Sequence, residues 1–287
     1  MIADRRETVG SAQYVKRPGR PSGDGARTGF RSSDDSLQGA QFSECAISWD
    51  RTSLDFALIR ESSIDRSRHR FRASLPHLIW NAAALEGNTF TLPEVQTLLD
   101  GVTVGGKPTS DALQIIALSD GYSRLDEMVG SGEFSLLKPV SDAIHARVAV
   151  HEAIESGHFR GQGQVGGGGT VRLANGGIAP GFPEGPNGEL LVERFERTVR
   201  YLSRVTDPRE RALAYFASAT RQQFYFDGNK RTSRLMMSGE LMTHGFDVVS
   251  VPFARKFEFN AALDELFTTD DATSLMNFLI SCAGAKL

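Results

Sequence analysis

Apolar residues recur with helical spacing along most of the chain, from about residue 52 to the C-terminus. The clearest segments of this kind span residues 77–88, 91–101, 111–128, 137–157, 189–205, 207–223, 229–245, 257–267 and 271–283. The segment 91–101 also carries a helix-start signature, with Thr91 as N-cap, Pro93 in the first turn and Glu94 three residues after the cap. The pattern predicts an all-α fold, and we see no internal repeat in it.

A different pattern occupies residues 157–188, where glycines and prolines interrupt the helical spacing. Inside this stretch, "TVRLA" (170–174) has the short, β-branched character of a strand, and the glycines around it mark turns. We therefore predict a flexible flap, a small β-hairpin at about 159–181, lying over the helical body. The glycine run at 166–169 is interpreted as a mobile loop rather than as a phosphate cradle.

The first 44 residues differ from the rest in being rich in Gly, Ser, Arg and Asp and poor in large apolar residues. Such a segment buries too little surface to offset the loss of chain entropy, so we predict a disordered basic and polar tail at 1–44 and one domain at 45–287. Within the tail, "KRPGRPSG" (16–23) is similar to arms that bind the DNA minor groove, but Pro18 replaces an expected cation. We favour a solvated tail and keep DNA-linked regulation as a third hypothesis.

Composition adds few constraints: the 287 residues are 40% hydrophobic and 23% charged, with a net charge of −3. That charge gives no general reason to expect nucleic acid or an anionic membrane as a partner. Only Cys45 and Cys282 occur, so a disulfide framework is not expected. No apolar run is long enough to span a bilayer, and the N-terminus lacks the apolar segment of a secretory signal. We therefore expect a cytoplasmic protein without a membrane partner.

The strongest candidate for chemistry is "DGNKRTSR" (227–234), which places several cations at the start of an apolar helix. If Asn229 begins that helix, the backbone N–H groups of Gly228, Asn229 and Lys230 point outward and the helix dipole favours an anion. Gly228 also permits a close approach of the backbone to such an anion. The segment therefore predicts a phosphate-binding site.

Three further side chains complete this predicted site. Arg231 and Arg234 lie three residues apart on the helix, so both can reach the same side. Asp227 stands at the mouth, where its oxygen atoms are placed to hold Mg²⁺ next to a polyphosphate.

Two other patterns are excluded as sites. "GVTVGGK" (101–107) has the spacing of a P-loop, but Pro108 follows the lysine where a hydroxyl is needed, and a helix precedes the loop where a strand is needed. His145 and His151 stand six residues apart, on different helical faces, without a cluster of other ligands. Both histidines are interpreted as ordinary helix residues.

Residues 223–234 resemble the signature of the Fic/Doc (Fido) family, H-x-F-x-[DE]-G-N-G-R-x-x-R. Aligned on Gly228 and Asn229, the remaining motif positions hold Gln223, Tyr225, Asp227, Lys230, Arg231 and Arg234. The segment at about 73–88 resembles the inhibitory helix of one Fic class, [ST]-x-x-x-E-[GN], with Glu86-Gly87 at its end and Ala82 in place of Ser/Thr. "GHFR" (157–160) resembles the approach to the family's β-hairpin flap, and the likeness covers about residues 70–285.

This resemblance implies a helical domain that binds Mg²⁺ with ATP or another nucleoside triphosphate and transfers AMP to a hydroxyl side chain of a target protein. It implies that Asp227 holds the metal, that Gly228, Asn229 and Arg231 contact phosphate, and that Arg234 binds the γ-phosphate or pairs with Glu86. A Glu86–Arg234 pair would keep such an enzyme inactive. The flap would clamp the target segment as an added strand. Fic proteins also serve as toxins and injected effectors.

Three departures from the motif bear on activity. Gln223 stands at the position of the catalytic histidine, and an amide cannot accept a proton from a hydroxyl group. Lys230 replaces a glycine, as in the "NKR" motif of the Doc branch, which implies phosphate transfer and makes Lys230 a second candidate catalytic residue. Tyr225 in place of Phe is interpreted as a packing change.

Two hypotheses from different classes follow. The first is a transferase of AMP or phosphate onto Ser, Thr or Tyr hydroxyls with weakened activity. The second is a catalytically inactive module that keeps the fold and binds a nucleotide or a protein.

Overall fold

The structure of the chain is a computed structural model, and it describes residues 33–284. In chain order its α-helices are α1 Ser33–Cys45, α2 Ile64–Ala73, α3 Leu75–Leu85, α4 Leu92–Leu99, α5 Thr109–Ser131, α6 Lys138–Val148, α7 Glu189–Leu202, α8 Pro208–Gln222, α9 Asn229–Thr243, α10 Lys256–Thr269 and α11 Thr273–Cys282. The strands β1 Val171–Arg172 and β2 Ile178–Ala179 form the one sheet in the described range. These elements confirm the predicted all-α fold with a small β-hairpin.

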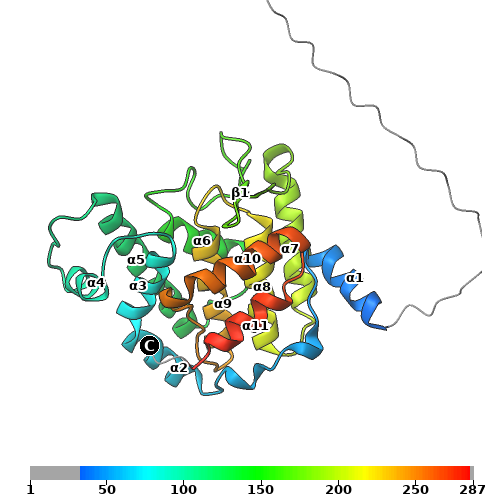
Figure 1. Cartoon of the computed structure of the whole chain (residues 1–287), viewed down its shortest axis with the longest axis horizontal. Helices are drawn as coiled ribbons and strands as arrows, with labels where there is room; N and C mark the ends of the chain where they lie inside the picture. The colour runs from blue at the N-terminus through cyan, green and yellow to red at the C-terminus, as the bar shows by residue number, and fades with distance from the viewer. Residues whose placement is uncertain (1–32, 285–287) are drawn as a thin grey trace, which may run out of the picture.

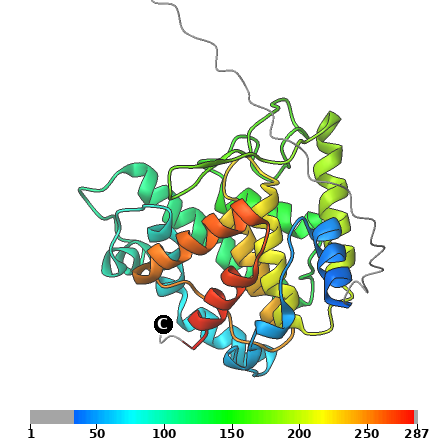
Figure 2. The same ribbon diagram turned by 45° about the vertical axis from the view of Figure 1, so that its right-hand side comes forward.

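Helices α8 and α9 form the centre of the helical body, as Figure 1 and Figure 2 show. Every residue from Ala212 to Thr220 of α8 and from Arg231 to Met242 of α9 is buried. A helix that is covered on all sides belongs in a protein core. Helices α5 and α6 pack against α9 from one side, and α10 and α11 pack against α8 from the other. The loop that joins α8 to α9, residues 223–228, is therefore held by buried helices at both ends.

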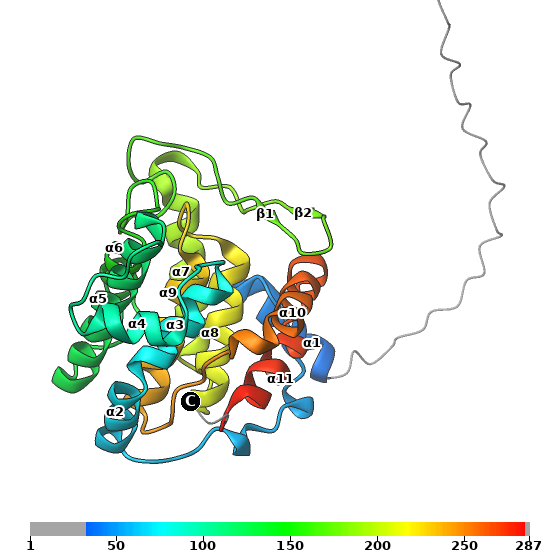
Figure 3. The ribbon, with the colours of Figure 1, turned by 60° about the vertical axis from the view of Figure 1, so that its left-hand side comes forward.

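The two-stranded hairpin lies where the sequence predicts the flap. Its strands are antiparallel, with Val171 opposite Ala179 and Arg172 opposite Ile178. Leu173 and Ala179 pack against Phe267 of α10 in a small apolar cluster. Figure 3 shows the hairpin reaching over the helical body to the end of α10. The flap thereby covers the region where α9 begins.

Helix α1 differs from the prediction of a disordered tail at 1–44, because Ser33–Cys45 is helical and packs against α7. The Thr198 hydroxyl donates to the carbonyl oxygen of Glu44 (3.1 Å), and Gln41 Oε1 accepts from the backbone N–H of Trp49 (3.0 Å). Gln41 and Cys45 are buried while residues 37–40 are exposed, so tertiary contacts support this helix rather than an apolar stripe. The "KRPGRPSG" segment lies outside the described residues.

Within residues 33–284, no helix combines the length and the apolar character that crossing a membrane requires.

Candidate functional site

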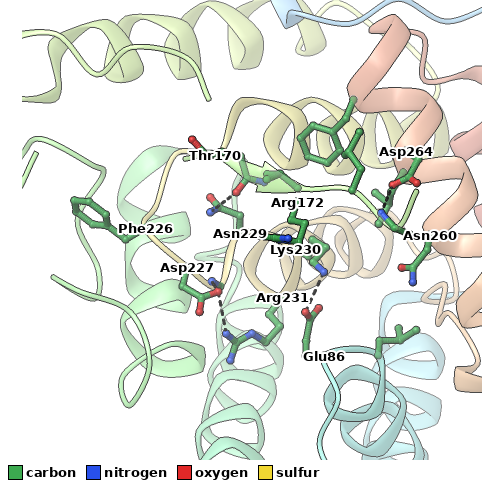
Figure 4. A pocket seen from close by; sticks show the side chains of 18 residues that line it. Glu86, Thr170, Arg172, Phe226, Asp227, Asn229, Lys230, Arg231, Asn260 and Asp264 are labelled. Atoms are coloured by element: carbon green, nitrogen blue, oxygen red, sulfur yellow. Dashed lines mark hydrogen bonds and ion pairs between the residues drawn. The ribbon is translucent and has the colours of Figure 1, made fainter. Parts of the chain in front are cut away.

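A cavity of about 440 Å³ opens between the start of α9, the flap and α10. It is lined by Leu85, Glu86, Thr170, Val171, Arg172, Leu173, Ala174, Gln223, Phe226, Asp227, Gly228, Asn229, Lys230, Arg231, Asn260, Leu263, Asp264 and Phe267. Figure 4 shows Lys230 and Arg231 of α9 on one wall, Glu86 below them and the flap strand across the top. The cavity therefore brings together the end of α3, the 223–234 segment, the flap and α10.

The Gln223 side chain braces the turn between α8 and α9. Its backbone is in the left-handed region (φ 52°), at the C-terminal end of α8. The side-chain Nε2 donates to the carbonyl oxygen of Thr220 (2.6 Å), and Oε1 accepts from Asn229 Nδ2 (3.1 Å). Both ends of the amide are thus engaged within the protein, and the amide has no basic atom to offer a reacting hydroxyl.

Asn229 and Gly228 shape the backbone at the start of α9. Asn229 Oδ1 accepts from the backbone N–H of Tyr225 (2.9 Å), and its Nδ2 donates to the Tyr225 carbonyl oxygen (2.7 Å). Gly228 has φ 72°, and a Cβ there would lie 2.8 Å from the Ala149 methyl group and 3.3 Å from His145 Nε2. Glycine is therefore required both by the backbone conformation and by the close packing beneath the loop.

His145 supports this loop from below. It is fully buried, and its ring stacks on Tyr225 with 3.7 Å between the ring centroids. Its Nδ1 accepts from the Gly157 N–H (2.8 Å), so Nε2 carries the proton and donates to the Asp227 carbonyl oxygen (2.9 Å). Burial lowers the pKa of His145 to about 4, so the ring is neutral near pH 7. His151, in contrast, lies in an exposed turn after α6 and not on a helix.

The three cations of α9 have different partners. Lys230 Nζ lies 3.0 Å from Glu86 Oε2. Arg231 forms an ion pair with Glu152, donates to the Val148 carbonyl oxygen (3.1 Å) and lies 3.5 Å from Asp227 Oδ1.

Arg234 is buried, and none of its three guanidinium nitrogens has a hydrogen-bond partner among the described residues. The predicted Glu86–Arg234 pair is therefore replaced by a Glu86–Lys230 pair. Lys230 lies in the first turn of α9, next to the end of α3, whereas Arg234 lies one turn further along the helix.

The charge of Glu86 follows from these neighbours. Burial acts to raise the pKa of its carboxyl group, but Lys230 and Arg234 outweigh that effect and the net pKa is lowered. Its Oε1 atom is buried and receives no hydrogen bond from the residues in the described range, while Oε2 contacts Lys230. Glu86 is thus an ionised carboxylate held against the cationic wall of the cavity.

Asp227 is the exposed carboxylate of this segment, with 62% of its side chain accessible. Its Oδ1 accepts from the backbone N–H of Gly228 (2.5 Å). No group of three or more metal-ligating side chains occurs in the part of the chain that the structure describes. A single open carboxylate fits Mg²⁺, which usually keeps several waters and takes further oxygens from a substrate's phosphates.

Comparison with known proteins identifies the fold. No family model matches the chain. The protein adenylyltransferases Fic of Drosophila erecta and Drosophila ananassae are 28% and 29% identical to it over 233 residues, which is 80% of this chain and 44% of each relative. A Fic domain-containing signaling protein from Bacteroides thetaiotaomicron has a TM-score of 0.64 at 18% identity, covering 86% of this chain and 92% of that structure. Fic-1 of C. elegans (residues 134–508) has a TM-score of 0.60 at 20% identity, covering 77% and 68%.

The chain has the Fic fold and is similar in sequence to Fic protein adenylyltransferases. The predicted motif, inhibitory segment and flap lie around one cavity of this Fic fold. The chain spans less than half the length of the curated relatives named above, whose names describe protein adenylyltransferases.

Tyr225 of the Fic motif is more than the packing change that the sequence predicts. Its ring is buried, and its hydroxyl donates to Asp142 Oδ1 (2.9 Å) and lies 2.8 Å from the Ser141 hydroxyl. Burial and the nearby Asp142 carboxylate raise its pKa well above the usual value, so the hydroxyl keeps its proton. Ser141 and Asp142 on α6 therefore supply the partners that a tyrosine needs at this position.

Sequence reasoning missed the part of the Fic cavity that α10 contributes. Asp264 accepts the backbone N–H groups of Ala174 and Asn175 through its two oxygens, at 2.9 Å each, and so holds the tip of the flap. Asn260 and Phe267 line the cavity from the same helix. The helical pattern of 257–267 predicted the element, but nothing in the pattern indicated which of its residues face the motif.

Proposed function

We propose that this Fic-fold protein binds a nucleoside triphosphate with Mg²⁺ in the cavity and transfers AMP or phosphate to a hydroxyl side chain of a target protein, with weakened activity. The observation that carries the proposal is Arg234, whose buried guanidinium has no acceptor among the described residues. A buried charge without a partner is costly. Arg234 lies one turn further along α9 than the cavity-lining Lys230, and a phosphate group that reached it would supply the missing acceptors. The names of the Fic relatives support a nucleotide as the substrate.

Each residue of the segment has a role in this proposal. The backbone N–H groups of Gly228, Asn229 and Lys230 receive a phosphate group at the N-terminus of α9. Asp227 holds Mg²⁺, which neutralises phosphate charge when it is bound. Arg231 lies beside Asp227 and contacts phosphate.

Glu86 acts as the inhibitory residue in this proposal. Its carboxylate forms an ion pair with Lys230. The positive charge of Arg234 is also close enough to help lower the pKa of Glu86. A bound triphosphate would bring negative charge to the same cations, so the carboxylate and the phosphates compete. The end of α3 therefore keeps the affinity for nucleotide low until Glu86 moves away.

The flap would present the target protein. An extended peptide can add to the exposed edge of a small sheet through main-chain hydrogen bonds. Strand β1 lines the cavity through Val171 and Arg172, so a hydroxyl side chain on the added strand would face the phosphates. Cys45 and Cys282 are both free and buried, and we include a cytoplasmic location in the same proposal.

The alternative is a binding module without chemistry. It is favoured by one observation, that both ends of the Gln223 amide are used to brace the α8–α9 turn. Loss of a general base typically lowers a rate by about 10²–10⁴-fold, which leaves room for slow transfer because positioning and charge stabilisation remain.

The experiment that separates these functions uses Glu86→Gly protein with Mg²⁺, ATP labelled at the α- or the γ-phosphate, and a cell extract as the source of targets. Label from the α-phosphate on protein supports AMP transfer, and label from the γ-phosphate alone supports phosphate transfer through Lys230. ATP binding without transfer of either label supports the binding module. Asp227→Asn in the same background is the control, and transfer that persists in it would contradict the role of Asp227.

A further inference from the structure

Arg160 connects the flap to the motif loop from a buried position. Its side chain is 1% exposed and is not among the residues that line the cavity. The guanidinium Nε donates to the carbonyl oxygen of Gln223 (2.8 Å), and the Arg160 backbone N–H donates to the carbonyl oxygen of Phe224 (2.9 Å). Arg160 therefore contacts the backbone directly at the position of the family's catalytic histidine.

The other two nitrogens of the same guanidinium hold both sides of the flap. Nη1 donates to the carbonyl oxygens of Gly167 (3.0 Å) and Gly168 (3.1 Å), on the segment that enters the hairpin. Nη2 donates to the carbonyl oxygen of Phe182 (2.9 Å), on the segment that leaves it. Glu184, at 3.5 Å, is the anionic partner in the described range. One planar group thus ties the entry and the exit of the flap to the motif loop.

The glycines of the flap are required for this close approach. A Cβ on Gly169 would lie 2.5 Å from Arg160 Cζ, and a Cβ on Gly168 would lie 2.9 Å from Phe226 Cδ1. A Cβ on Gly181 would lie 2.6 Å from the Gly169 carbonyl oxygen. Within the glycine run that the sequence predicted as a mobile loop, Gly169 is therefore packed tightly against Arg160 and Gly168 against Phe226.

A purely structural role explains this arrangement less well. The Arg160 guanidinium donates to three neutral backbone carbonyls of the flap and to the Gln223 carbonyl. The buried charge of Arg160 is therefore compensated mainly by peptide dipoles rather than by a carboxylate. Apolar side chains could fill the same space without burying a charge. Only a guanidinium, with five donors in one plane, can hold the flap and the motif loop together in several directions at once.

We propose that Arg160 is a positioning residue that sets the register of flap strand β1 relative to Gln223, and so aligns the target hydroxyl with the phosphate that is transferred. This inference rests on the proposed transferase function. Arg160 acts through the flap and does not touch the nucleotide. Its loss is therefore expected to lower transfer to a target and to leave ATP binding in place.

The test compares Arg160→Lys with Arg194→Lys, both in the Glu86→Gly background. Arg194 is a matched control, since its guanidinium lies over the ring of Phe182 (4.0 Å), the same flap residue that Arg160 holds. Arg160→Lys keeps the positive charge but loses the planar set of guanidinium donors. Label transfer should therefore fall by roughly 10- to 100-fold, the range that small misplacements of reacting groups produce. ATP affinity measured by calorimetry should stay within about twofold of the parent variant. Arg194→Lys should change neither quantity.

Amide hydrogen exchange tests the coupling of the flap and the motif loop without relying on label transfer. In Arg160→Lys, amides at 164–182 and at 223–226 should exchange faster together, while those of α9 and α10 should not. Gly169→Ala provides a second variant, because it keeps Arg160 but forces the flap away from it, and it should give the same pattern.

If the parent variant transfers no label, the proposed function fails, and exchange then decides whether Arg160 couples the two segments. Equal losses of ATP affinity and transfer, or faster exchange in only one of the two segments, would overturn the inference.

Discussion

At the residue scale, the cavity is a balance between the cations of α9 and a few carboxylates. Glu86 forms an ion pair with Lys230, and Arg231 lies close to Glu152 and Asp227. The guanidinium of Arg234 has no hydrogen-bond partner among the residues that the structure describes. Lys230 stands where the Fic motif has glycine, so the Glu86 carboxylate has a partner in this chain that the motif does not provide.

Replacing Glu86 with Gln should strengthen nucleotide binding. The variant keeps the shape of the side chain and removes the charge that opposes the phosphates, so the affinity for Mg²⁺-ATP should rise roughly tenfold, or about 1.4 kcal/mol. Isothermal calorimetry measures this directly. Glu94→Gln is the matched control, because Glu94 pairs with Lys107 at 2.9 Å and does not line the cavity. Equal affinities for Glu86→Gln and the parent protein would remove the inhibitory role of Glu86.

Replacing Gln223 with His should raise transfer of label to protein. A histidine at this position supplies the general base that an amide lacks, and such a base is worth about 10²–10⁴ in rate. The assay is the labelled-ATP experiment in the Glu86→Gly background, with Gln223→Asn as a control that stays an amide. A variant that binds ATP but shows no gain would mean that the histidine cannot reach the reacting hydroxyl.

At the element scale, the site depends on how closely helices approach α9. Gly239 of α9 faces Phe134, and a Cβ there would lie 2.2 Å from Phe134 Cε2. Gly121 of α5 meets Val148 of α6 in the same way, at 2.2 Å. Glycines inside helices are unfavourable by propensity, so their presence here reflects packing. Close packing of α5 and α6 on α9 in turn places His145 under the motif loop.

Gly239→Ala should therefore destabilise the protein, although alanine favours helices by about 1 kcal/mol over glycine. Overpacking against the Phe134 ring typically costs about 1–3 kcal/mol and outweighs that gain. The free energy of unfolding in urea is the measurement. In a Phe134→Leu background, which opens space at the contact, the same substitution should become neutral or stabilising. Stabilisation by Gly239→Ala alone would show that Phe134 moves aside without penalty.

At the scale of the whole molecule, stability depends on pH through the buried His145. Its pKa is lowered from 6.5 to about 4 in the folded protein, mainly by burial. Between these values the unfolded chain binds a proton at this residue and the folded chain does not. The contribution of His145 to stability is therefore fully present above pH 6.5 and is lost as the pH drops toward 4, by at most about 3 kcal/mol.

His145→Gln should remove this part of the pH dependence. Urea unfolding between pH 4 and 6.5 should show a shallower loss of stability in the variant than in the parent protein. His69→Gln, on an exposed face of α2, serves as the control. Identical slopes for His145→Gln and the parent would contradict the assignment of a neutral, buried His145.

The sequence by itself determined helices α3 to α11, the flap and the order of the Fic-like segments, but not α1 or α2. Helical periodicity and the Gly-Asn turn at the start of α9 are local features, so both can be recognised in the sequence. The motif and the Glu86 segment could be recognised for the same reason. Helix α1 was not predicted because its few buried residues form no apolar stripe.

Only the tertiary structure decided which side chains meet. Glu86 binds Lys230 rather than Arg234, Arg160 reaches Gln223, and Asp264 holds the flap tip. Each of these contacts joins segments that are far apart in the chain. Their geometry follows from the way α3, α9, α10 and the flap pack around one another, and no local pattern encodes that arrangement.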